Sequence, residues 1–540
     1  MSITLRDYQQ KSVDQMRSFF SKNPTGNVIY QSPTGTGKTV GFSFMGSESI
    51  KKGKKVFILS NRTELMGQAG GAFEKFGINP VYLDRHHKVP PLNTLATSGM
   101  MQTTMRRLQT KEGRDFLQSR NLIIADEIHI ADIDPILKSG LVDHIPIVGA
   151  TATPRRMGGQ TQLGMHWDEL ILGEQVRYFV ERGWLMPDRY FGVDCGDVSD
   201  IPYDSKTGDY QGYAMYKHFD KREKYAGVID NYRTHADGTK ALTFCSNQHH
   251  AIKTAVEFDK AGIETRFLVS GKNKPNKPDE WEDELQRIRY EQHLELYLLL
   301  KQYKHLTGDR KTLLSDLQRG KITNLVNVAM LTTGVDIPSL ETVIMDRYTL
   351  SLPLYLQCLG RGSRPSPETG KIHFTVLDHG NAAGRTENNL GRYMDSRPWG
   401  LWHETSKGGG VAGTKLCDKN KEDKFKRRGC NRLVHIGAKI CKCGFVFATE
   451  KELKEAELKE IAYGDTIPEE VLVSTMNAKQ LQAYSKLKGH KGNGWLLRQL
   501  FYKKGNESLK AGLKELGYKS YYYLRIKQQA KDQNWPVKKI

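Results

Sequence analysis

The 540-residue sequence lacks any long apolar run, and no stretch reaches the roughly 18 residues that a membrane-spanning helix needs. The first residues, Met1–Asp7, do not have the pattern of a secretory signal peptide. Cysteine is scarce, with seven residues. An odd number of cysteines without a secretory signal argues for a reducing compartment. These absences predict a cytosolic protein.

Acidic residues are also in short supply. The chain has 81 lysines and arginines against 61 acids, a net charge of +20. Residues 477–540 alone hold 15 lysines and arginines against three acids. Such clustering favours a nucleic-acid partner, because phosphate contacts need lysine and arginine; a merely soluble basic surface is the alternative. The length predicts three or four domains.

The chain alternates helical patterns with short, nearly continuous apolar segments, which are typical of strands buried on both faces of a parallel sheet. We therefore expect two α/β units built from βαβ repeats. The expected strands are Asn27–Gln31, Val56–Ser60, Thr94–Thr97, Leu122–Ala125 and Ile147–Ala150, then Lys240–Cys245, Thr265–Val269, Lys321–Asn327, Thr342–Asp346 and His373–Asp378. The expected division is 1–160 and 226–390 for the two units, 161–225 as a bridging region, 275–305 as a helical insertion, 400–447 as a linker with a Cys-rich module, and 448–540 as a basic C-terminal region.

A glycine-rich segment between an expected strand and an expected helix matches the phosphate-binding loop GxxxxGK[ST], except that a serine replaces its first glycine. Its glycines allow backbone N–H groups to wrap phosphates, its lysine would contact the β- and γ-phosphates, and its last threonine would ligate Mg²⁺. The expected ATP-binding residues of this loop are Ser32, Pro33, Thr34, Gly35, Thr36, Gly37, Lys38 and Thr39.

Two acids, Asp126 and Glu127, follow the apolar segment Leu122–Ala125. Carboxylates at the end of a strand, on the edge that carries the phosphate loop, are placed to serve Mg·ATP. Asp126 is expected to hold Mg²⁺, and Glu127 to orient the attacking water. The two motifs together predict ATP hydrolysis.

These motifs occur in order with others, and together they resemble superfamily 2 helicases, in particular DEAD/DEAH-like (DExH-box) DNA helicases of bacteria and phages. The DExH box is Asp126-Glu127-Ile128-His129. The other segments are Leu5-Arg6-Asp7-Tyr8-Gln9, Gly149–Pro154, Leu331–Pro338 and Gln357–Pro365. The resemblance covers about residues 1–385. It implies two tandem RecA-like domains that clamp ATP, and a bacterial or phage-infected cell as the setting.

The resemblance also implies roles for individual residues. Gln9 and Arg6 are expected at the adenine, and Gly334 and Asp336 at the ribose. Gln357, Arg361 and Arg364 are expected in the last motif, with at least one arginine on the γ-phosphate, where a fixed positive charge stabilises the transition state. Residues expected to contact a strand or couple hydrolysis to its movement are Arg62, Gln68, Thr97, Ser98, Gln102, His129, Thr151 and Thr153.

Four of the seven cysteines, Cys417, Cys430, Cys441 and Cys443, lie close together in the sequence. Four thiolates can close a structural zinc site. The spacing is irregular, His435 could replace one ligand, and free thiols are the alternative. The cofactors expected are thus ATP and Mg²⁺, with Zn²⁺ from this cluster.

The basic tail mixes lysines with aromatic residues, a combination suited to single-stranded or branched nucleic acid. Part of it, Trp495–Phe501, has helical apolar spacing and predicts a small core instead. Overall the sequence predicts an ATP-dependent DNA helicase or translocase in replication, recombination or repair. The alternatives are an RNA helicase, the motor subunit of a restriction or defence assembly, and a scaffold with an inactive ATPase. One chain supplies every motif, so a monomer suffices.

Overall fold

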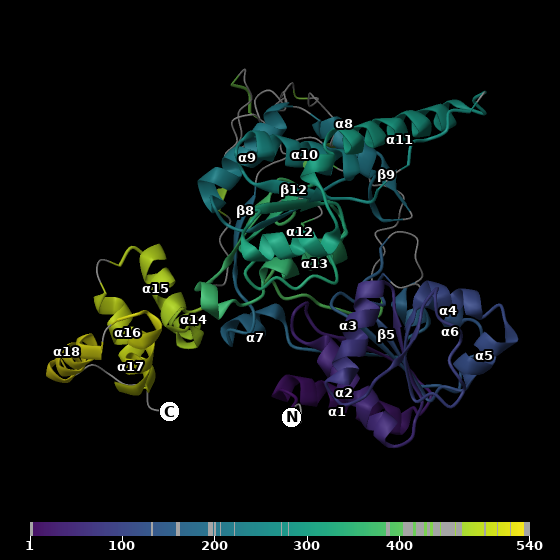
Figure 1. The fold of residues 1–540 in the computed structure, drawn as a ribbon, viewed down its shortest axis with the longest axis horizontal. Helices are drawn as coiled ribbons and strands as arrows, with labels where there is room; N and C mark the ends of the chain where they lie inside the picture. The colour runs from purple at the N-terminus through teal and green to yellow at the C-terminus, as the bar shows by residue number, and fades with distance from the viewer. Residues whose placement is uncertain are drawn as a thin grey trace.

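The computed structural model contains two α/β lobes and a separate C-terminal helical bundle (Figure 1). It describes residues 4–402 and 467–533, with gaps at 131–132, 158–161, 193–197, 199–200, 206, 221, 272, 279, 385–388, 491–492, 505 and 519, together with 414–416, 426–428, 433–435, 443 and 459–460. None of the described helices combines the length and apolar character that crossing a bilayer requires.

The first lobe is a seven-stranded parallel sheet of order β3-β4-β2-β5-β6-β1-β7. Its strands are β1 (Asn27–Gln31), β2 (Val56–Ser60), β3 (Val81–Leu83), β4 (Ala96–Met100), β5 (Leu122–Asp126), β6 (Ile147–Thr151) and β7 (Glu169–Leu172). Its helices are α1 (Asp7–Lys22), α2 (Lys38–Lys51), α3 (Thr63–Glu74), α4 (Met101–Arg107), α5 (Lys111–Gln118) and α6 (Asp134–Leu137), with a 3₁₀ turn at Leu163–Met165.

Both faces of this sheet are covered, which explains the continuous apolar strands. One apolar cluster joins α1, α2 and α3 to one face through residues such as Val13, Phe42 and Ile58. A second cluster covers the opposite face with residues such as Phe57 and Phe116. All residues of β2, β5 and β6 are buried. Parallel sheets of this kind are stable only between two helical layers.

The second lobe is a seven-stranded sheet of order β12-β13-β11-β14-β15-β8-β18, parallel except for β18. Its strands are β8 (Asp188–Gly192), β11 (Ala241–Cys245), β12 (Thr265–Leu268), β13 (Asn324–Asn327), β14 (Thr342–Asp346), β15 (Phe374–Asp378) and β18 (Lys459–Glu460). Its helices are α8 (Gly212–Phe219), α9 (Arg222–Ala236), α10 (Gln248–Lys260), α11 (Glu284–Gln302), α12 (Arg310–Arg319) and α13 (Leu352–Gly362), with 3₁₀ turns at Lys304–Leu306 and Pro367–Thr369. Two small antiparallel pairs, β9 (Tyr203–Asp204) with β10 (Asp209–Tyr210) and β16 (Thr414–Leu416) with β17 (Leu433–His435), complete the strands.

The expectation of two parallel α/β units is therefore confirmed, with some differences in detail. The strand expected at Thr94–Thr97 is found at Ala96–Met100. The charged insertion forms α11, a helix that extends away from the second lobe (Figure 1). The region 161–225, which the sequence left unassigned, supplies β7 to the first sheet and β8 to the second.

The described residues show two crossings of the chain between the lobes, and β18 then lies in the second sheet again. The chain first leaves β7, forms α7 (Val176–Glu181) and enters β8. After β15 it returns to the first lobe, where Gly164 N donates to Leu401 O at 3.0 Å. Leu401 packs against the core of the first lobe, whereas Trp399 packs against the core of the second. Two of the segments that join the lobes are therefore described from end to end.

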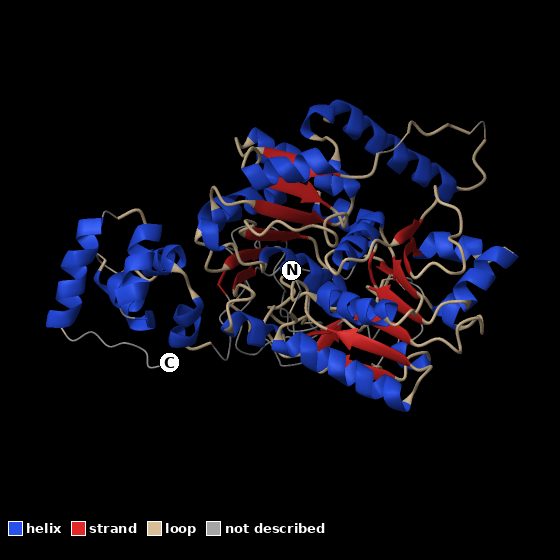
Figure 2. Cartoon of the chain, turned by 60° about the horizontal axis from the view of Figure 1, so that its bottom comes forward, coloured by secondary structure: helices blue, strands red, loops and turns tan. Residues whose placement is uncertain are grey.

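The C-terminal bundle stands beside the second lobe (Figures 1 and 2). Its helices are α14 (Glu469–Thr475), α15 (Ala478–Leu487), α16 (Gly494–Lys504), α17 (Asn506–Glu515) and α18 (Ser520–Asp532). Leu481, Leu496, Leu500 and Leu509 form its core, and Trp495 and Phe501 pack against them. The apolar spacing in the tail therefore belongs to a core, as its periodicity predicts.

Candidate ATP site between the two lobes

The phosphate loop lies between the end of β1 and the start of α2. Gly35 and Gly37 have φ values of 89° and 83°, a region that glycine adopts without steric cost. A hydroxyl pair, Ser32 Oγ and Thr36 Oγ1, lies 2.6 Å apart inside the loop, so the serine that departs from the consensus is used internally. Lys38 is the first residue of α2 and is buried. The loop therefore has the open backbone and the helix N-terminus that bind phosphates.

Gln9 lies against this loop. Its amide nitrogen donates to Gly37 O at 3.3 Å, and its amide oxygen accepts from Arg6 N at 3.0 Å. A side chain at position 37 would place its Cβ 2.7 Å from the Gln9 amide, so Gly37 is also needed for this close approach. Arg6 lies over the ring of Trp184, 4.7 Å from its centroid. The structure thus brings Gln9 and Arg6 to the loop, with Arg6 supported by an aromatic residue that precedes β8.

The acidic pair follows β5 at the same edge. Asp126 is buried, and both burial and the adjacent Glu127 charge raise the pKa of its carboxyl, while Lys38 acts in the opposite direction. Glu127 has φ 53°, a strained value for a residue other than glycine. Its Oε1 lies 3.9 Å from Lys38 Nζ, and its buried Oε2 lies 3.3 Å from His129 Nδ1.

These observations fit Mg²⁺, the metal that the resemblance implies. Two carboxylates are buried beside one lysine, which leaves an excess of negative charge that a hard cation would neutralise. Oxygen donors are the ligands Mg²⁺ prefers, and it is usually held by one or two carboxylates together with substrate phosphates. Asp126 and the partly buried hydroxyl of Thr39 are the residues that would hold it.

His129 connects the two lobes. Its Nδ1 lies 2.7 Å from Thr151 Oγ1, and its Nε2 lies 2.5 Å from the amide nitrogen of Gln357 on α13. Burial lowers the pKa of His129 to about 4, so the ring is neutral at pH 7. The Gln357 amide donates to Nε2, and the ring proton is therefore on Nδ1, facing Thr151. Thr153 belongs to the same network, because its N–H donates to Thr151 Oγ1 at 3.1 Å.

The two arginines of α13 and the loop after it lie in different surroundings. Arg361 is buried and donates to Val335 O at 2.5 Å, and burial lowers its pKa to about 10. Arg364 donates to Asp336 Oδ1 at 2.5 Å and reaches the phosphate loop. A Cβ on Gly35 would lie 3.1 Å from Arg364 Nε, which is buried without a partner among the described residues. Arg364 therefore presents an unused donor to the phosphates.

Close contact between the lobes holds Arg364 beside the phosphate loop. A Cβ on Gly360 of α13 would lie 2.9 Å from the Thr34 side chain of the phosphate loop. Gly334 has φ 69°, and Arg310 donates to its carbonyl at 3.4 Å. The phosphate loop, the acidic pair and the arginines thus face one another across the space between the lobes.

The residues expected to contact a strand are not all placed alike. Arg62 crosses between lobes and donates to Ala329 O and Met330 O, each at 3.4 Å. Gln68 and Gln102 are exposed. Thr97 and Ser98 are buried in β4, and Ser98 Oγ donates to Met66 O. The side chains of Thr97 and Ser98 therefore do not reach the surface.

The expected zinc cluster lies mostly outside the described residues. Cys417, Cys430 and Cys441 are among the residues whose structure is not described, and Cys443 is exposed. A different group, Cys245, His250 and Asp346, brings three donor atoms within 4.8 Å of one another inside the second lobe. His250 Nε2 lies 3.0 Å from Asp346 Oδ2 there, an ordinary buried pair.

Sequence reasoning missed three side chains near the site. Tyr8 donates its hydroxyl to Thr36 O of the phosphate loop. Trp184 supports Arg6, and Lys371 lies buried behind the arginines. Tyr8 lies inside the motif that contains Gln9, which was the available signal. Trp184 and Lys371 lie outside every motif, and only the folded chain brings them there.

Comparison with known proteins agrees with this geometry. Residues 2–156 match the family described as "Type III restriction enzyme, res subunit", and residues 223–366 match "Helicase conserved C-terminal domain". The "51.5 kDa protein" of Lactococcus phage (isolate 7-9) is 26% identical over 492 residues, covering 88% of this chain and 93% of that protein. IRC3 of Saccharomyces cerevisiae, a proposed ATP-dependent helicase, is 24% identical over 397 residues, 69% of this chain and 51% of its own length.

Among solved structures, a proposed HsdR subunit fragment of a type I restriction enzyme from Vibrio vulnificus YJ016 has a TM-score of 0.48. It is 18% identical and covers 72% of this chain and 67% of that chain. The two domain matches fall on the two lobes, and the expectation of tandem RecA-like domains is confirmed. The chain belongs to the superfamily 2 DExH-type helicases and is an ATP-hydrolysing helicase.

Proposed function

We propose that this helicase couples ATP hydrolysis to movement along DNA, or to its unwinding, through an arginine that the second lobe supplies to the phosphate loop of the first. The observation that carries this proposal is the position of Arg364 beside Gly35. An arginine that reaches the γ-phosphate only when the lobes meet makes hydrolysis depend on lobe closure.

Each residue of the site then has a role. Lys38 binds the β- and γ-phosphates, and Asp126 and Thr39 hold Mg²⁺, which supplies positive charge to the phosphate oxygens. Glu127 accepts a proton from the attacking water and orients it. Its position supports this role, because Glu127 lies between Lys38 and His129, 3.9 Å and 3.3 Å away, at the edge that carries the phosphate loop. Arg361 and Arg364 stabilise the charge that develops on the γ-phosphate.

The contact between His129 and Gln357 carries the state of the ATP site to the strand path. Thr151 and Thr153 share the network of His129, and Arg62 contacts the loop at 329–330 of the other lobe. Opening or closing the lobes therefore changes the surface around Arg62, Gln68 and Gln102 where a strand would lie. We leave Thr97 and Ser98 out of this path because they are buried.

The substrate is proposed to be DNA, single-stranded or branched, in replication, recombination or repair. The C-terminal bundle supports a nucleic-acid partner, since Lys486, Lys488, Lys510 and Lys514 are exposed on it. RNA remains the alternative substrate. A second candidate function is the motor of a restriction or defence assembly, which the restriction-subunit description of the matching family favours.

The test is the ATPase rate with no nucleic acid, single-stranded DNA, duplex DNA, a four-way junction and single-stranded RNA. We expect strong stimulation by DNA, greatest for the junction. Stimulation by RNA alone would overturn the DNA proposal, and equal rates with and without every nucleic acid would overturn coupling in the isolated chain. Strand displacement separates a helicase from a translocase, and a copurifying nuclease would favour the restriction motor.

A further inference from the structure

Lys371 is a buried cation in the second lobe, and it lies behind the two arginines rather than in the ATP site. It follows the 3₁₀ turn at Pro367–Thr369 and precedes β15, and only 4% of it is exposed. Its Nζ lies within hydrogen-bond distance of four backbone carbonyls, which share its three N–H donors: Gly362 O at 2.6 Å, Arg364 O at 2.9 Å, Pro338 O at 3.2 Å, and Leu340 O. Lys371 lies in neither a helix nor a strand, so regular secondary structure does not explain why a lysine is found here.

The four carbonyls belong to two segments that carry the proposed ATP-site residues. Gly362 ends α13 and Arg364 lies in the loop just after it, whereas Pro338 and Leu340 end the loop that holds Asp336. The last carbonyls of a helix have no partner within the helix, and a cation there is favourable. Lys371 therefore ties the backbone of the two segments, and the ion pair of Arg364 with Asp336 joins their side chains.

This arrangement is costly to maintain, which argues that the charge has a purpose. Burial lowers the pKa of Lys371 to about 7, since moving an ammonium out of water is unfavourable, and Arg364 lowers it further while Glu341 acts oppositely. The four carbonyl oxygens also favour the charged form. An apolar side chain would avoid the cost of burial but would leave these carbonyls unsatisfied.

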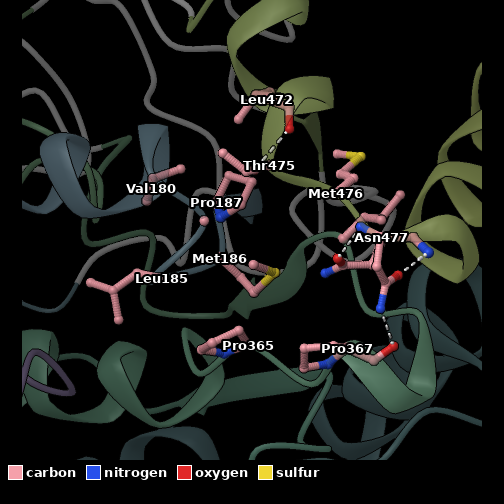
Figure 3. A pocket seen from close by; sticks show the side chains of 13 residues that line it. Val180, Leu185, Met186, Pro187, Pro365, Pro367, Leu472, Thr475, Met476 and Asn477 are labelled. Carbon is pink, nitrogen blue, oxygen red and sulfur yellow. Dashed lines mark hydrogen bonds between the residues drawn. The ribbon is translucent and has the colours of Figure 1, made fainter. Parts of the chain in front are cut away.

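The C-terminal bundle holds the same residue from outside. Gln480 of α15 donates its amide nitrogen to Lys371 O at 2.7 Å, and both groups are buried. Asn477 donates to Pro367 O at 3.0 Å, which Figure 3 shows beside Pro365. The bundle is thus seated on the segment that runs from the arginines to Lys371.

The interface between the bundle and the second lobe is not fully packed. A cavity of about 140 Å³ separates α14 from the second lobe, and Leu185, Met186, Leu472 and Met476 line it (Figure 3). Apolar packing holds the bundle around this cavity, because Ile372 joins the bundle core and Leu472 packs against Val180 and Leu185. The hydrogen bonds of Gln480 and Asn477 add specific contacts beside Lys371.

We propose that Lys371 is a positioning residue for ATP hydrolysis, which holds the arginine-bearing end of α13 against the Asp336 loop, and that the C-terminal bundle holds Lys371 in turn through Gln480. The proposal rests on the proposed role of Arg364. A bundle that binds nucleic acid would then act on hydrolysis through this contact, without touching the nucleotide.

The experiment compares kcat and KM for ATP with saturating single-stranded DNA, using the full chain and Lys371→Met. Methionine keeps the length of the side chain and removes the donors. We expect kcat to fall about 10- to 100-fold, because an error of about 1 Å in position is enough for such a loss. The affinity for a non-hydrolysable ATP analogue should stay within about twofold, since Lys371 touches no nucleotide-binding atom. Lys371→Arg, which keeps the charge, should recover part of kcat.

Lys240→Met is the matched control. Lys240 also donates to a main-chain carbonyl in the second lobe, Gln318 O at 2.6 Å, and to the Ser339 hydroxyl at 3.4 Å, so it reaches the Asp336 segment but does not tie it to α13. We expect its kcat to equal that of the wild type. The proposal would be overturned if Lys240→Met lost as much kcat as Lys371→Met. It would also be overturned if the lower kcat of Lys371→Met were fully explained by a smaller folded fraction in a thermal melt.

Two further variants separate this proposal from the one on which it rests. If Arg364→Ala keeps wild-type kcat, the arginine role fails and the Lys371 role fails with it. If Arg364→Ala loses kcat, then adding Lys371→Met to it should cost little more, because the two act as a unit. Fully multiplicative losses would overturn the positioning role alone. Gln480→Ala leaves Lys371 in place, and unchanged kcat there would overturn the part played by the bundle, even if Lys371→Met failed to fold.

Discussion

Gln357 of the second lobe donates its amide to His129 of the first, with 2.5 Å between the two nitrogens. This bond joins the DExH box directly to the helix that leads to Arg361 and Arg364. Because His129 also contacts Thr151, one side chain touches the hydrolysis machinery, the other lobe and the expected coupling element.

Gln357→Ala removes this bond while leaving the phosphate loop intact. We expect stimulation of the ATPase by DNA to fall about tenfold, the effect of losing a buried bond of about 1.4 kcal/mol, with ATP binding unchanged. Stimulation ratios with and without single-stranded DNA measure it. Gln318→Ala, at an exposed position of α12, is the control and should behave as wild type. Equal stimulation in both variants would show that the contact does not couple the lobes.

Lys38→Ala should reduce ATP hydrolysis to background while DNA binding stays near the wild-type level, since Lys38 lies in the phosphate loop and away from the surface. The measurement is phosphate release together with a DNA-binding titration. Lys51→Ala changes an exposed lysine at the other end of the same helix and should have no effect. Normal turnover in Lys38→Ala would remove the phosphate-loop assignment.

The buried, neutral His129 predicts a dependence of stability on pH. Its folded pKa of about 4 lies below the ordinary value, so between pH 6.5 and 4 the unfolded chain binds a proton that the folded chain does not. The contribution of His129 to stability should therefore fall as pH decreases through this window, by about 3 kcal/mol, whereas the raised pKa of Asp126 acts in the opposite direction.

Melting temperatures at pH 7 and pH 5 test this dependence. The fall between the two should be smaller in His129→Gln than in the wild type. His305→Gln, which changes an exposed histidine, should keep the wild-type difference. If His129→Gln also kept it, another group would be responsible for the pH effect.

The exposed lysines of the bundle give a prediction about salt. Replacing Lys486, Lys488, Lys510 and Lys514 with glutamine should weaken DNA binding and flatten its dependence on salt, by about 0.7 to 0.9 in slope for each phosphate that the bundle no longer neutralises. Glutamine replacement of Lys51, Lys52, Lys54 and Lys75, on the first lobe, is the control of equal charge. An identical slope in both quadruple variants would mean that the bundle charge only aids solubility.

The cysteine cluster remains a prediction that metal analysis can decide. If Cys417, Cys430, Cys441 and Cys443 form a closed site, the purified chain should carry about one Zn²⁺ per molecule. Changing Cys443 to serine should lower that content, whereas changing the buried Cys358 to alanine should not. A metal-free wild-type chain would favour free thiols.

The ATP site could be predicted from sequence because each of its parts lies in a short contiguous motif. Gly35, Gly37 and Lys38 must be neighbours to wrap phosphates, so their spacing is visible in the chain. The strands could be placed because both faces of each sheet are buried, which leaves apolar runs such as Val56–Ser60. Thr97 shows the limit: its position in a motif suggested contact with a strand, but its side chain is buried because both faces of the sheet around β4 are covered.

Other features depend on contacts between distant parts of the chain. Lys371 looks like any surface lysine in the sequence, and only the packing of α13, the Asp336 loop and α15 surrounds it. The region 161–225 could be predicted only as a bridge because its strands divide among three sheets: β7 joins the first, β8 the second, and β9 pairs with β10. Neither β7 nor β8 lies in a repeated strand–helix pattern that would show which sheet it joins.

The two crossings of the chain between the lobes also have a mechanical consequence. A single tether lets two bodies swivel in any direction, but two separated tethers leave mainly rotation about the line that joins them. The segments through α7 and through residues 397–402 are such a pair of connections between the lobes. The covalent connections thus restrict how the lobes can separate, so that we expect them to open mainly by rotation about this line.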